Sequence, residues 1–465
     1  MAINNLQKLT VNQLVKNFKE ATGCEAPPEN KMYTCDKDTQ IRPVAEYESM
    51  GGALVAYIGT QAPDADHKQL PPSGKRTFGV PDDLIVRMQQ LGTKNGSIKA
   101  EDKPVHIFIL CDDEDEKENI ISRLQKSADQ NGLNFDPELV HLIPWDADTY
   151  WTRDYCPWWV KYKDKDIYAI SKHIYTSLGG GSVGMIEGAE NVNPREGSGI
   201  FRCNDDYGAV RISDYFNSPI RKRNNAAWAD DKKLSPIEPH RWFFSGLLNV
   251  GGNYMATSQG VIASSYLVAT QNELPNDADP EHPDKKSIDE RMKYIMEQTN
   301  RFLGANTYHV LTDPTGTYIG HIDCWGKFLA DDKIIIARTQ SAQVNEGLDA
   351  IEDYFKKAGF QTFRVTCPNI YVANEPETPA TTAPYTNSLI LNNHVYIPLC
   401  GIKEYDDAAI NAYTEAMGDG YVIEGIIGKK ETPWLGTDAL HCRTNAVPRT
   451  IVDRWLESQK STSVE

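Results

Sequence analysis

The sequence contains no apolar run of the roughly 18 residues that a membrane-spanning helix needs. The residues after Met1 also lack the apolar segment of a secretory signal peptide. None of the nine cysteines forms a CxxC pair, which argues against a zinc ribbon and against a thioredoxin-type motif. No low-complexity linker divides the chain into two large parts. These absences favour one large domain with no membrane partner.

Basic residues are few relative to acidic ones. The 48 Lys and Arg residues face 65 Asp and Glu residues, which gives a formal net charge of −17. Such a surface repels nucleic acid and anionic membranes, so we expect neither as a partner. The plainest interpretation of the acidity is solubility, with attraction of cationic substrates as a secondary effect.

Apolar periodicity predicts an α/β fold built from a repeated hairpin-helix-strand unit. Hairpins are expected over 327–337 and 389–397, and a further strand over 260–268. The helix over 345–358 is expected to bury Leu348, Ile351, Tyr354 and Phe355. Helices are predicted over 81–92, 116–131, 284–303, 345–358 and 406–417, followed by strands over 105–110, 139–143, 307–311, 361–366 and 421–426.

The organisation along the chain follows from these elements. We expect an N-terminal extension over 1–45, one α/β domain over 46–457 and a C-terminal tail over 458–465. Residues 177–199 and 374–384 are predicted to be long irregular loops. Polar motifs follow several of the strands, so loops from separate units are expected to converge on one site.

Cys442 is the candidate nucleophile. It lies in Gly436-Thr-Asp-Ala-Leu-His-Cys-Arg-Thr444, a polar run that starts with glycine. A thiolate, rather than a thiol, attacks carbon, and a neighbouring cation favours the thiolate. The alternative is a buried structural cysteine, which the polar surroundings disfavour.

His321 is the candidate general acid and base, because imidazole titrates nearest neutral pH. In an extended segment His321 and Asp323 point to the same face. One alternative is a satisfied histidine at a strand end. Another is a metal site formed by His321, Asp323, His441 and Cys442, although no spaced His or Cys pair supports it.

Asp154 and Asp323 are candidate clamps for a guanidinium group. A guanidinium is a planar fork of five N–H donors, and a carboxylate accepts two of them side by side. An ion pair between Arg153 and Asp154 is the structural alternative. Trp151 either stacks on the guanidinium plane or packs in the core.

Two asparagines carry weaker signals. Asn253 follows Gly251 and Gly252, which permit an unusual backbone shape. Asn387 lies in a Thr-Asn-Ser turn, where Asn usually caps the backbone.

Together these motifs resemble the guanidino-group-modifying (pentein) superfamily, which includes agmatine deiminases and peptidylarginine deiminases. The resemblance is closest to the Porphyromonas-type peptidylarginine deiminases and runs from about residue 45 to 450. It rests on the segments Trp151-Thr-Arg-Asp-Tyr155, Leu248-Asn-Val-Gly-Gly-Asn-Tyr-Met255, His321-Ile-Asp-Cys-Trp-Gly-Lys-Phe328, Pro384-Tyr-Thr-Asn-Ser388 and Thr432-Pro-Trp-Leu-Gly-Thr-Asp-Ala-Leu-His-Cys-Arg-Thr444.

The resemblance implies a five-fold pseudosymmetric α/β propeller that hydrolyses arginine guanidinium groups in peptides or proteins to citrulline and ammonia. Cys442 would form a covalent thiouronium, His321 would shuttle protons, and Asp154 and Asp323 would bind the guanidinium nitrogens. Asn387 would orient the site. Substrate-binding roles are expected for Trp151, Arg202, Tyr318, Asn253 and Thr437.

The resemblance further implies calcium-independent catalysis with no metal or organic cofactor, while leaving room for a structural cation. Secretion is expected from the resemblance, although the chain carries no signal peptide. The family binds the carboxylate of a C-terminal arginine with two arginines. Arg202 matches the second of them, and the first is absent. Arg195, in the glycine-rich segment before Arg202, is present instead. One alternative is a deiminase of agmatine or free arginine. Arg202 disfavours agmatine, because the tail of agmatine is cationic. The other alternative is a non-catalytic arginine-binding propeller.

Overall fold

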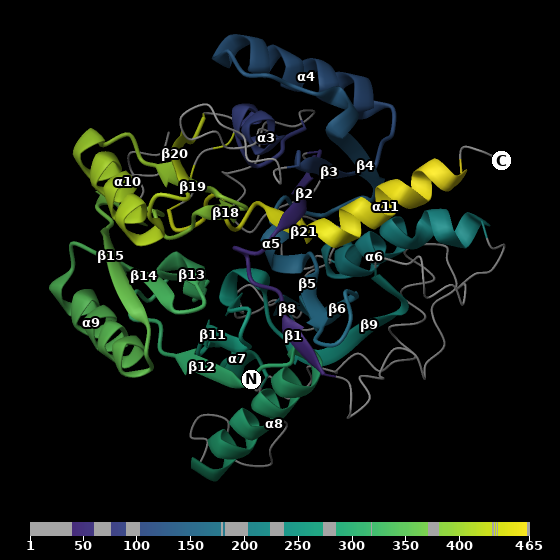
Figure 1. Ribbon diagram of the computed structural model, residues 1–465. Helices are drawn as coiled ribbons and strands as arrows, with labels where there is room; N and C mark the ends of the chain where they lie inside the picture. Colours follow the sequence, from purple (N-terminus) through teal and green to yellow (C-terminus); the bar gives the residue numbers. More distant parts are fainter. Residues whose placement is uncertain are drawn as a thin grey trace.

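The computed structural model describes most of the chain between Gln40 and Thr462. The described residues are 40–59, 76–89, 103–177, 180–181, 203–223, 237–272, 285–317, 319–370, 381–429, 432, 434 and 436–462. They form a mixed α/β fold in which strands lie inside and helices lie outside (Figure 1). Within them, no helix has both the length and the apolar character needed to cross a membrane.

The described strands form five sheets of three or four strands and two short pairs, β7-β8 and β16-β17. The strand orders of the five sheets are β1-β5-β6-β9, β10-β11-β12, β13-β14-β15, β18-β19-β20 and β21-β2-β3-β4. The strands are β1 (Ile41–Pro43), β2 (Met50–Ala56), β3 (His106–Cys111), β4 (Val140–Pro144), β5 (Trp158–Tyr162), β6 (Tyr168–Ile174), β7 (Thr176–Ser177), β8 (Gly180–Gly181), β9 (Ile237–Leu248), β10 (Met255–Ala256), β11 (Val261–Ser265), β12 (Thr307–Leu311), β13 (Gly326–Ala330), β14 (Lys333–Arg338), β15 (Gln361–Thr366), β16 (Asn369–Ile370), β17 (Thr381–Thr382), β18 (Leu389–Leu391), β19 (His394–Leu399), β20 (Val422–Ile427) and β21 (Asn445–Pro448).

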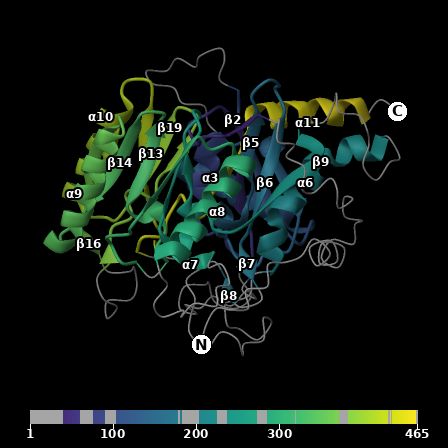
Figure 2. The ribbon, with the colours of Figure 1, turned by 90° about the horizontal axis from the view of Figure 1, so that it is seen from below.

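Helices connect and cover these sheets. In Figure 2, α9 and α10 lie at one side of the molecule, while α11 and α6 extend toward the other. The α-helices are α3 (Asp82–Gln89), α4 (Glu116–Asn131), α5 (Thr152–Tyr155), α6 (Cys203–Arg223), α7 (Leu267–Gln271), α8 (Lys285–Leu303), α9 (Ala342–Lys357), α10 (Lys403–Met417) and α11 (Arg449–Thr462). Single 3₁₀ turns are η2 (Pro137–Leu139), η4 (Gly251–Asn253) and η5 (Ile322–Cys324).

The predicted hairpin-helix-strand unit is confirmed. Strands β13 and β14 pair antiparallel, α9 follows, and β15 then pairs parallel to β14. The same order holds for β18, β19, α10 and β20. It also holds for β10, β11, α8 and β12. In each unit the helix closes a parallel crossover, which is the connection that parallel strands require.

Helix α9 illustrates how the sequence produces the local structure. Ser341 caps its start by accepting a hydrogen bond from the Val344 backbone N–H at 3.4 Å. Leu348, Ile351 and Phe355 are buried, as predicted. The prediction for Tyr354 is wrong, because its side chain is 44% exposed. Its ring lies at the edge of the apolar stripe, where its hydroxyl contacts His309 Nδ1 at 2.7 Å.

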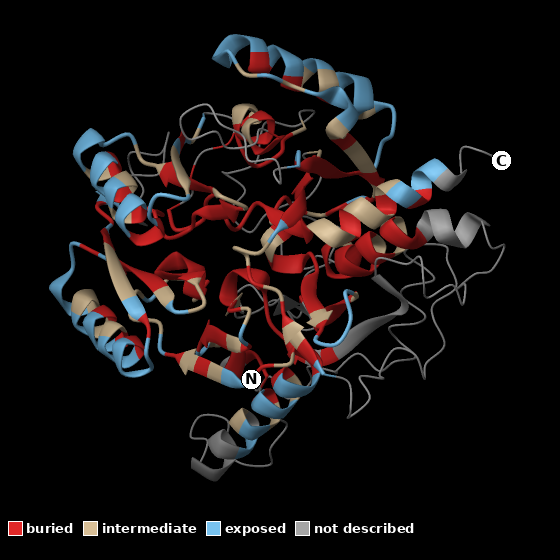
Figure 3. Ribbon diagram, in the orientation of Figure 1, coloured by how far each residue is buried: buried red, intermediate tan, exposed pale blue. Residues whose placement is uncertain are grey.

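The core occupies the inner strands, and the outer faces of α4, α8, α9 and α10 are exposed (Figure 3). No sheet closes on itself among the described strands. Strand β1 lies within the predicted N-terminal extension, and α11 continues to Thr462, into the predicted tail. Most of the two predicted irregular loops lies outside the described residues.

Candidate active site

Cys442 lies in the loop between Gly436 and β21, and Asn387 fixes its position. Gly436 takes a positive φ of 73°, a conformation that favours glycine. The Asn387 side-chain oxygen accepts hydrogen bonds from the backbone N–H groups of Cys442 and Ala439, at 3.1 and 3.0 Å. Its side-chain nitrogen lies 3.1 Å from the Cys442 sulfur. Asn387 therefore caps the backbone, as its turn context suggests, and also contacts the thiol.

His321 directly precedes a 3₁₀ turn, and Asp323 lies within that turn. The predicted strand-like alternation is wrong here, because Ile322–Cys324 forms the turn η5 with His321 at its N-cap. The two side chains nevertheless approach the same point. Both are buried, with exposures of 2% and 3%.

Gly252 marks the point on which three of the predicted residues converge. A Cβ atom built on Gly252 would lie 2.6 Å from His321 Nδ1, 2.9 Å from Asp154 Oδ1 and 3.1 Å from Asp323 Oδ2. The Gly252 backbone N–H also donates to Asp154 Oδ1 at 2.9 Å. Glycine thus leaves the space around which the imidazole and the two carboxylates gather.

Asp323 joins this group to the thiol. Its Oδ2 lies 3.4 Å from the Cys442 sulfur and 2.8 Å from His441 Nδ1. Asp154 is held on α5, where its backbone oxygen lies 2.8 Å from His173 Nε2. Arg153 extends elsewhere: its Nε donates to the His441 backbone oxygen at 3.2 Å, and its Nη2 lies 3.8 Å from Glu46.

The charges of the site determine its resting state. Burial raises the pKa of the Cys442 thiol well above its ordinary value, and the nearby carboxylates of Asp323, Asp438 and Asp154 raise it further. Burial lowers the pKa of His321, although the carboxylates of Asp323, Asp438 and Asp313 act to raise it. Burial alone would raise the pKa of Asp323, but the hydrogen bond and charge of His441 outweigh it and lower that pKa. The site therefore holds a protonated thiol, a neutral imidazole and an ionised carboxylate.

The ring nitrogens of His321 are available to bind a ligand. Neither of its ring nitrogens has a hydrogen-bond partner among the described residues. Buried polar atoms are normally paired, so such atoms are typical of a site that receives a ligand. A cation is the ligand that this charge pattern favours, because it would lie among ionised carboxylates.

Trp151 is positioned by a buried ion pair. Its indole N–H donates to Asp438 Oδ2 at 2.9 Å, and Arg443 Nη2 donates to the same oxygen at 2.8 Å. The Arg443 guanidinium is fully buried and lies against the Tyr150 and Trp434 rings. The sequence interpretation did not identify Asp438, although it lies inside the motif around Cys442.

The remaining predicted residues lie at different distances from this centre. The Asn253 side-chain oxygen accepts from the backbone N–H groups of Ser265 and Ile322, at 2.8 and 3.2 Å, and so holds the His321 segment. Thr437 is buried and hydrogen-bonds with Cys324. Arg202 and Tyr318 lie outside the described residues.

Two further residues adjoin the site: His441 and Glu46. His441 appeared in the sequence interpretation only as a member of the alternative metal set, and Glu46 did not appear at all. Among the described residues, no three His, Cys, Asp or Glu side chains are placed to hold a metal ion together.

Comparison with known structures finds the same fold in other proteins. The agmatine deiminase of C. jejuni matches with a TM-score of 0.54 and 14% identity, over 89% of this chain and 98% of that one. The agmatine deiminase of Enterococcus faecalis matches with a TM-score of 0.54 and 14% identity, over 91% and 98%. A protein described as an arginine deiminase from Porphyromonas gingivalis matches with a TM-score of 0.53 and 14% identity, over 88% and 99%. At these identities the likeness establishes the fold.

Fold and site together define a guanidino-group-modifying deiminase of the pentein superfamily. The sequence model of the Porphyromonas-type peptidyl-arginine deiminases matches residues 95–448, which is more than half of the chain. The chain belongs to the Porphyromonas-type peptidyl-arginine deiminase family.

Proposed function

We propose that this chain hydrolyses the guanidinium group of arginine in peptides or proteins, releasing citrulline and ammonia. The observation that carries the proposal is the convergence of His321, Asp154 and Asp323 around Gly252, with Cys442 in contact with Asp323. A thiol, a proton shuttle and two carboxylates are the groups that deimination of a planar cation requires.

The first role belongs to the two carboxylates. A guanidinium seated over Gly252 would donate to Asp154 on one side and to Asp323 on the other. Its positive charge would offset the carboxylates that raise the pKa of Cys442. Substrate binding itself therefore favours the thiolate, and the empty site keeps the thiol protonated and unreactive.

The chemical steps then follow from the remaining groups. The Cys442 thiol would pass its proton to the neutral His321 imidazole as its sulfur bonds to the guanidinium carbon, and one C–N bond of the resulting tetrahedral adduct would break. His321 would supply the proton that the departing nitrogen needs, so that ammonia leaves and a thiouronium remains. A water molecule, deprotonated by His321, would then attack the same carbon. Cleavage of the C–S bond would release the ureido product, and the proton that His321 took from water would return to the sulfur and restore the thiol.

The five sheets and their shared connectivity support a five-unit propeller as the scaffold. The reaction as written uses only side chains of this chain, so we propose that it runs without calcium or an organic cofactor. Arginine in a peptide is preferred over agmatine in this proposal because the family is that of the peptidyl-arginine deiminases.

Ureido-group formation tests the proposal directly. The substrates are a peptide ending in arginine, a peptide with internal arginine, and agmatine, with the Cys442→Ala variant as the control. Turnover of a peptide that is lost in the variant is the expected result. Turnover of agmatine alone would transfer the assignment to small guanidines, and no turnover by the folded protein would refute deimination.

A further inference from the structure

His441, the residue before the nucleophile, lies between two carboxylates. Its Nδ1 is 2.8 Å from Asp323 Oδ2, and its Nε2 is 3.1 Å from Glu46 Oε2. An ionised carboxylate only accepts hydrogen bonds, so the ring satisfies both partners only when both nitrogens carry protons. Each ring nitrogen of His441 thus faces one carboxylate.

Glu46 connects this histidine to a buried cation. The same Glu46 Oε2 accepts from Lys327 Nζ at 2.6 Å, and Glu46 Oε1 accepts from the Ile390 backbone N–H at 2.8 Å. Burial would raise the pKa of Glu46, yet the charges of Lys327, His441 and Arg153 lower it well below its ordinary value. Lys327, Glu46, His441 and Asp323 thus form one continuous row of polar contacts.

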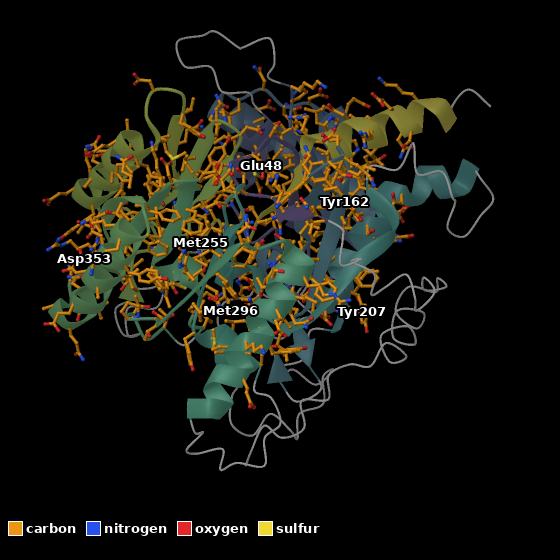
Figure 4. The ribbon with its side chains drawn as sticks, turned by 60° about the horizontal axis from the view of Figure 1, so that its bottom comes forward. Glu48, Tyr162, Tyr207, Met255, Met296 and Asp353 are labelled. Atoms are coloured by element: carbon orange, nitrogen blue, oxygen red, sulfur yellow. The ribbon has the colours of Figure 1, made fainter. Side chains whose placement is uncertain are left out.

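A cavity borders this row of residues. Glu46, Lys327, His441 and Asp323 line it together with apolar residues such as Met255. Met255, labelled in Figure 4, lies toward the middle of the molecule, whereas Asp353 lies at its edge. Lys327, His441 and Asp323 are buried, so the row passes through the interior rather than along the surface.

The lone pairs of Asp323 determine what His441 does. Oδ2 has two acceptor sites, of which His441 uses one and the Cys442 thiol uses the other. Among the residues that the structure describes, Oδ1 has only a weak contact, with the Cys324 sulfur at 3.8 Å. When the thiol passes its proton to His321, it no longer donates to Oδ2, and this acceptor site becomes available to a guanidinium N–H. The bond to His441 is the contact that keeps the carboxylate in place during this exchange.

We propose that His441, backed by Glu46, is a positioning residue that holds the Asp323 carboxylate for the guanidinium while the Cys442 thiol releases its proton. The inference rests on the proposed deimination at this site. In this proposal the His441 side chain contacts neither the reacting carbon nor the sulfur, and it acts through Asp323.

Two substitutions separate the two hydrogen bonds of His441. In His441→Asn the amide nitrogen occupies nearly the place of Nδ1 and retains the bond to Asp323. In His441→Gln it occupies nearly the place of Nε2 and retains only the bond to Glu46. We expect His441→Asn to keep most of the activity, and His441→Gln to lower kcat/KM about a hundredfold because Asp323 is misplaced.

Binding to the inactive protein provides a second readout. Calorimetry with a guanidinium ligand compares Cys442→Ala alone with the same variant carrying His441→Asn or His441→Gln. We expect about tenfold weaker binding with His441→Gln and little change with His441→Asn, because one charge-assisted hydrogen bond to the clamp is lost. The Glu46→Gln substitution removes the negative charge next to Nε2 of His441. We expect its affinity for the ligand to lie between those of the two His441 variants.

The control is His394→Gln. It alters a buried histidine 3.7 Å from the Glu424 carboxylate, outside the site, and should change neither readout. Equal binding by all variants, or equal loss in both His441 variants with lowered unfolding temperatures, would overturn the positioning role. If the unsubstituted protein turns over no guanidine, the proposed function fails, and the binding series still decides whether His441 positions the clamp.

Discussion

Asn387 contacts Cys442 through both ends of its side-chain amide: the oxygen accepts from the Cys442 backbone N–H, and the nitrogen lies 3.1 Å from the sulfur. One residue thus sets both the position of Cys442 and the polarity around its sulfur. A thiolate needs donors, and the amide nitrogen supplies one.

The Asn387→Asp variant tests this relationship. The carboxylate keeps the acceptor for the Cys442 and Ala439 backbone but replaces the donor with negative charge. We expect the pKa of Cys442 to rise further and turnover to fall at least about a hundredfold, as when a preorganised donor is removed. The rate of iodoacetamide labelling of Cys442 as a function of pH measures the pKa of its thiol. The exposed Asn306→Asp variant is the control, and equal labelling of both would contradict the role of Asn387.

Gly252→Ala is expected to abolish activity. The added methyl group would lie 2.6 Å from His321 Nδ1 and 2.9 Å from Asp154 Oδ1, so it would occupy the space of the guanidinium. A displacement of about 1 Å in such a site costs about a hundredfold in rate. Steady-state kinetics should show the loss, while circular dichroism should show a folded protein. Gly420→Ala, where no atom lies within 4 Å of the new Cβ, should retain full activity.

Local patterns explain why much of the fold was predictable. The apolar stripe of α9 and the two tight turns at Asp331 and Asn392 fix the elements by sequence-near interactions. Helix α6 was missed because its sequence contains Gly208 and Pro219, both helix breakers. Its buried Val210, Ile212 and Phe216 stabilise it by joining the same core cluster as Trp455 of α11, which no local pattern reveals.

The site likewise contains residues that local motifs identify and residues that only tertiary packing brings together. Short motifs identified Cys442, His321, Asp323 and Asp154, and the structure brings them together. Glu46 was missed because it is nearly the whole chain away from His441, and only tertiary packing brings the two together. Arg202 and Tyr318, which the resemblance assigns to substrate binding, stay predictions.

The buried pair of Asp438 and Arg443 should contribute strongly to stability. Arg443 is fully buried, and its Nε and Nη2 both donate to Asp438. Removing one partner of a buried pair typically costs about 3–5 kcal/mol, because the other charge stays buried without compensation. We expect the free energy of unfolding of Asp438→Ala to fall by about this amount in urea denaturation.

A surface pair provides the comparison. Lys403 and Asp407 lie 2.6 Å apart, with side chains 86% and 55% exposed. Asp407→Ala should change the free energy of unfolding by less than about 1 kcal/mol. Similar losses at both positions would contradict the importance of burial. Asp438→Ala should also release the Trp151 indole, which tryptophan fluorescence quenching would detect.

Two stacked histidines should make the protein sensitive to acid. His141 Nε2 lies 2.8 Å from His106 Nδ1, and the His141 ring also packs against Trp455 of α11. Burial first, and then the charges of His106 and Lys117, lower the pKa of His141 to about 3. The unfolded chain takes up the proton near pH 6.5, whereas the folded protein does not. Stability is therefore complete above about pH 6.5 and falls as the pH drops from there toward about 3.

His141→Phe removes this titration while keeping an aromatic ring against Trp455. The slope of unfolding free energy against pH should decrease by up to about 1.4 kcal/mol per pH unit between about pH 6 and about pH 4. Urea denaturation at a series of pH values measures both slopes. The variant retains the titration of His106, whose pKa burial also lowers, so some slope should persist. Identical slopes in the two proteins would show that the acid sensitivity does not come from His141. The contact between α11 and His141 would then have no role in the acid sensitivity.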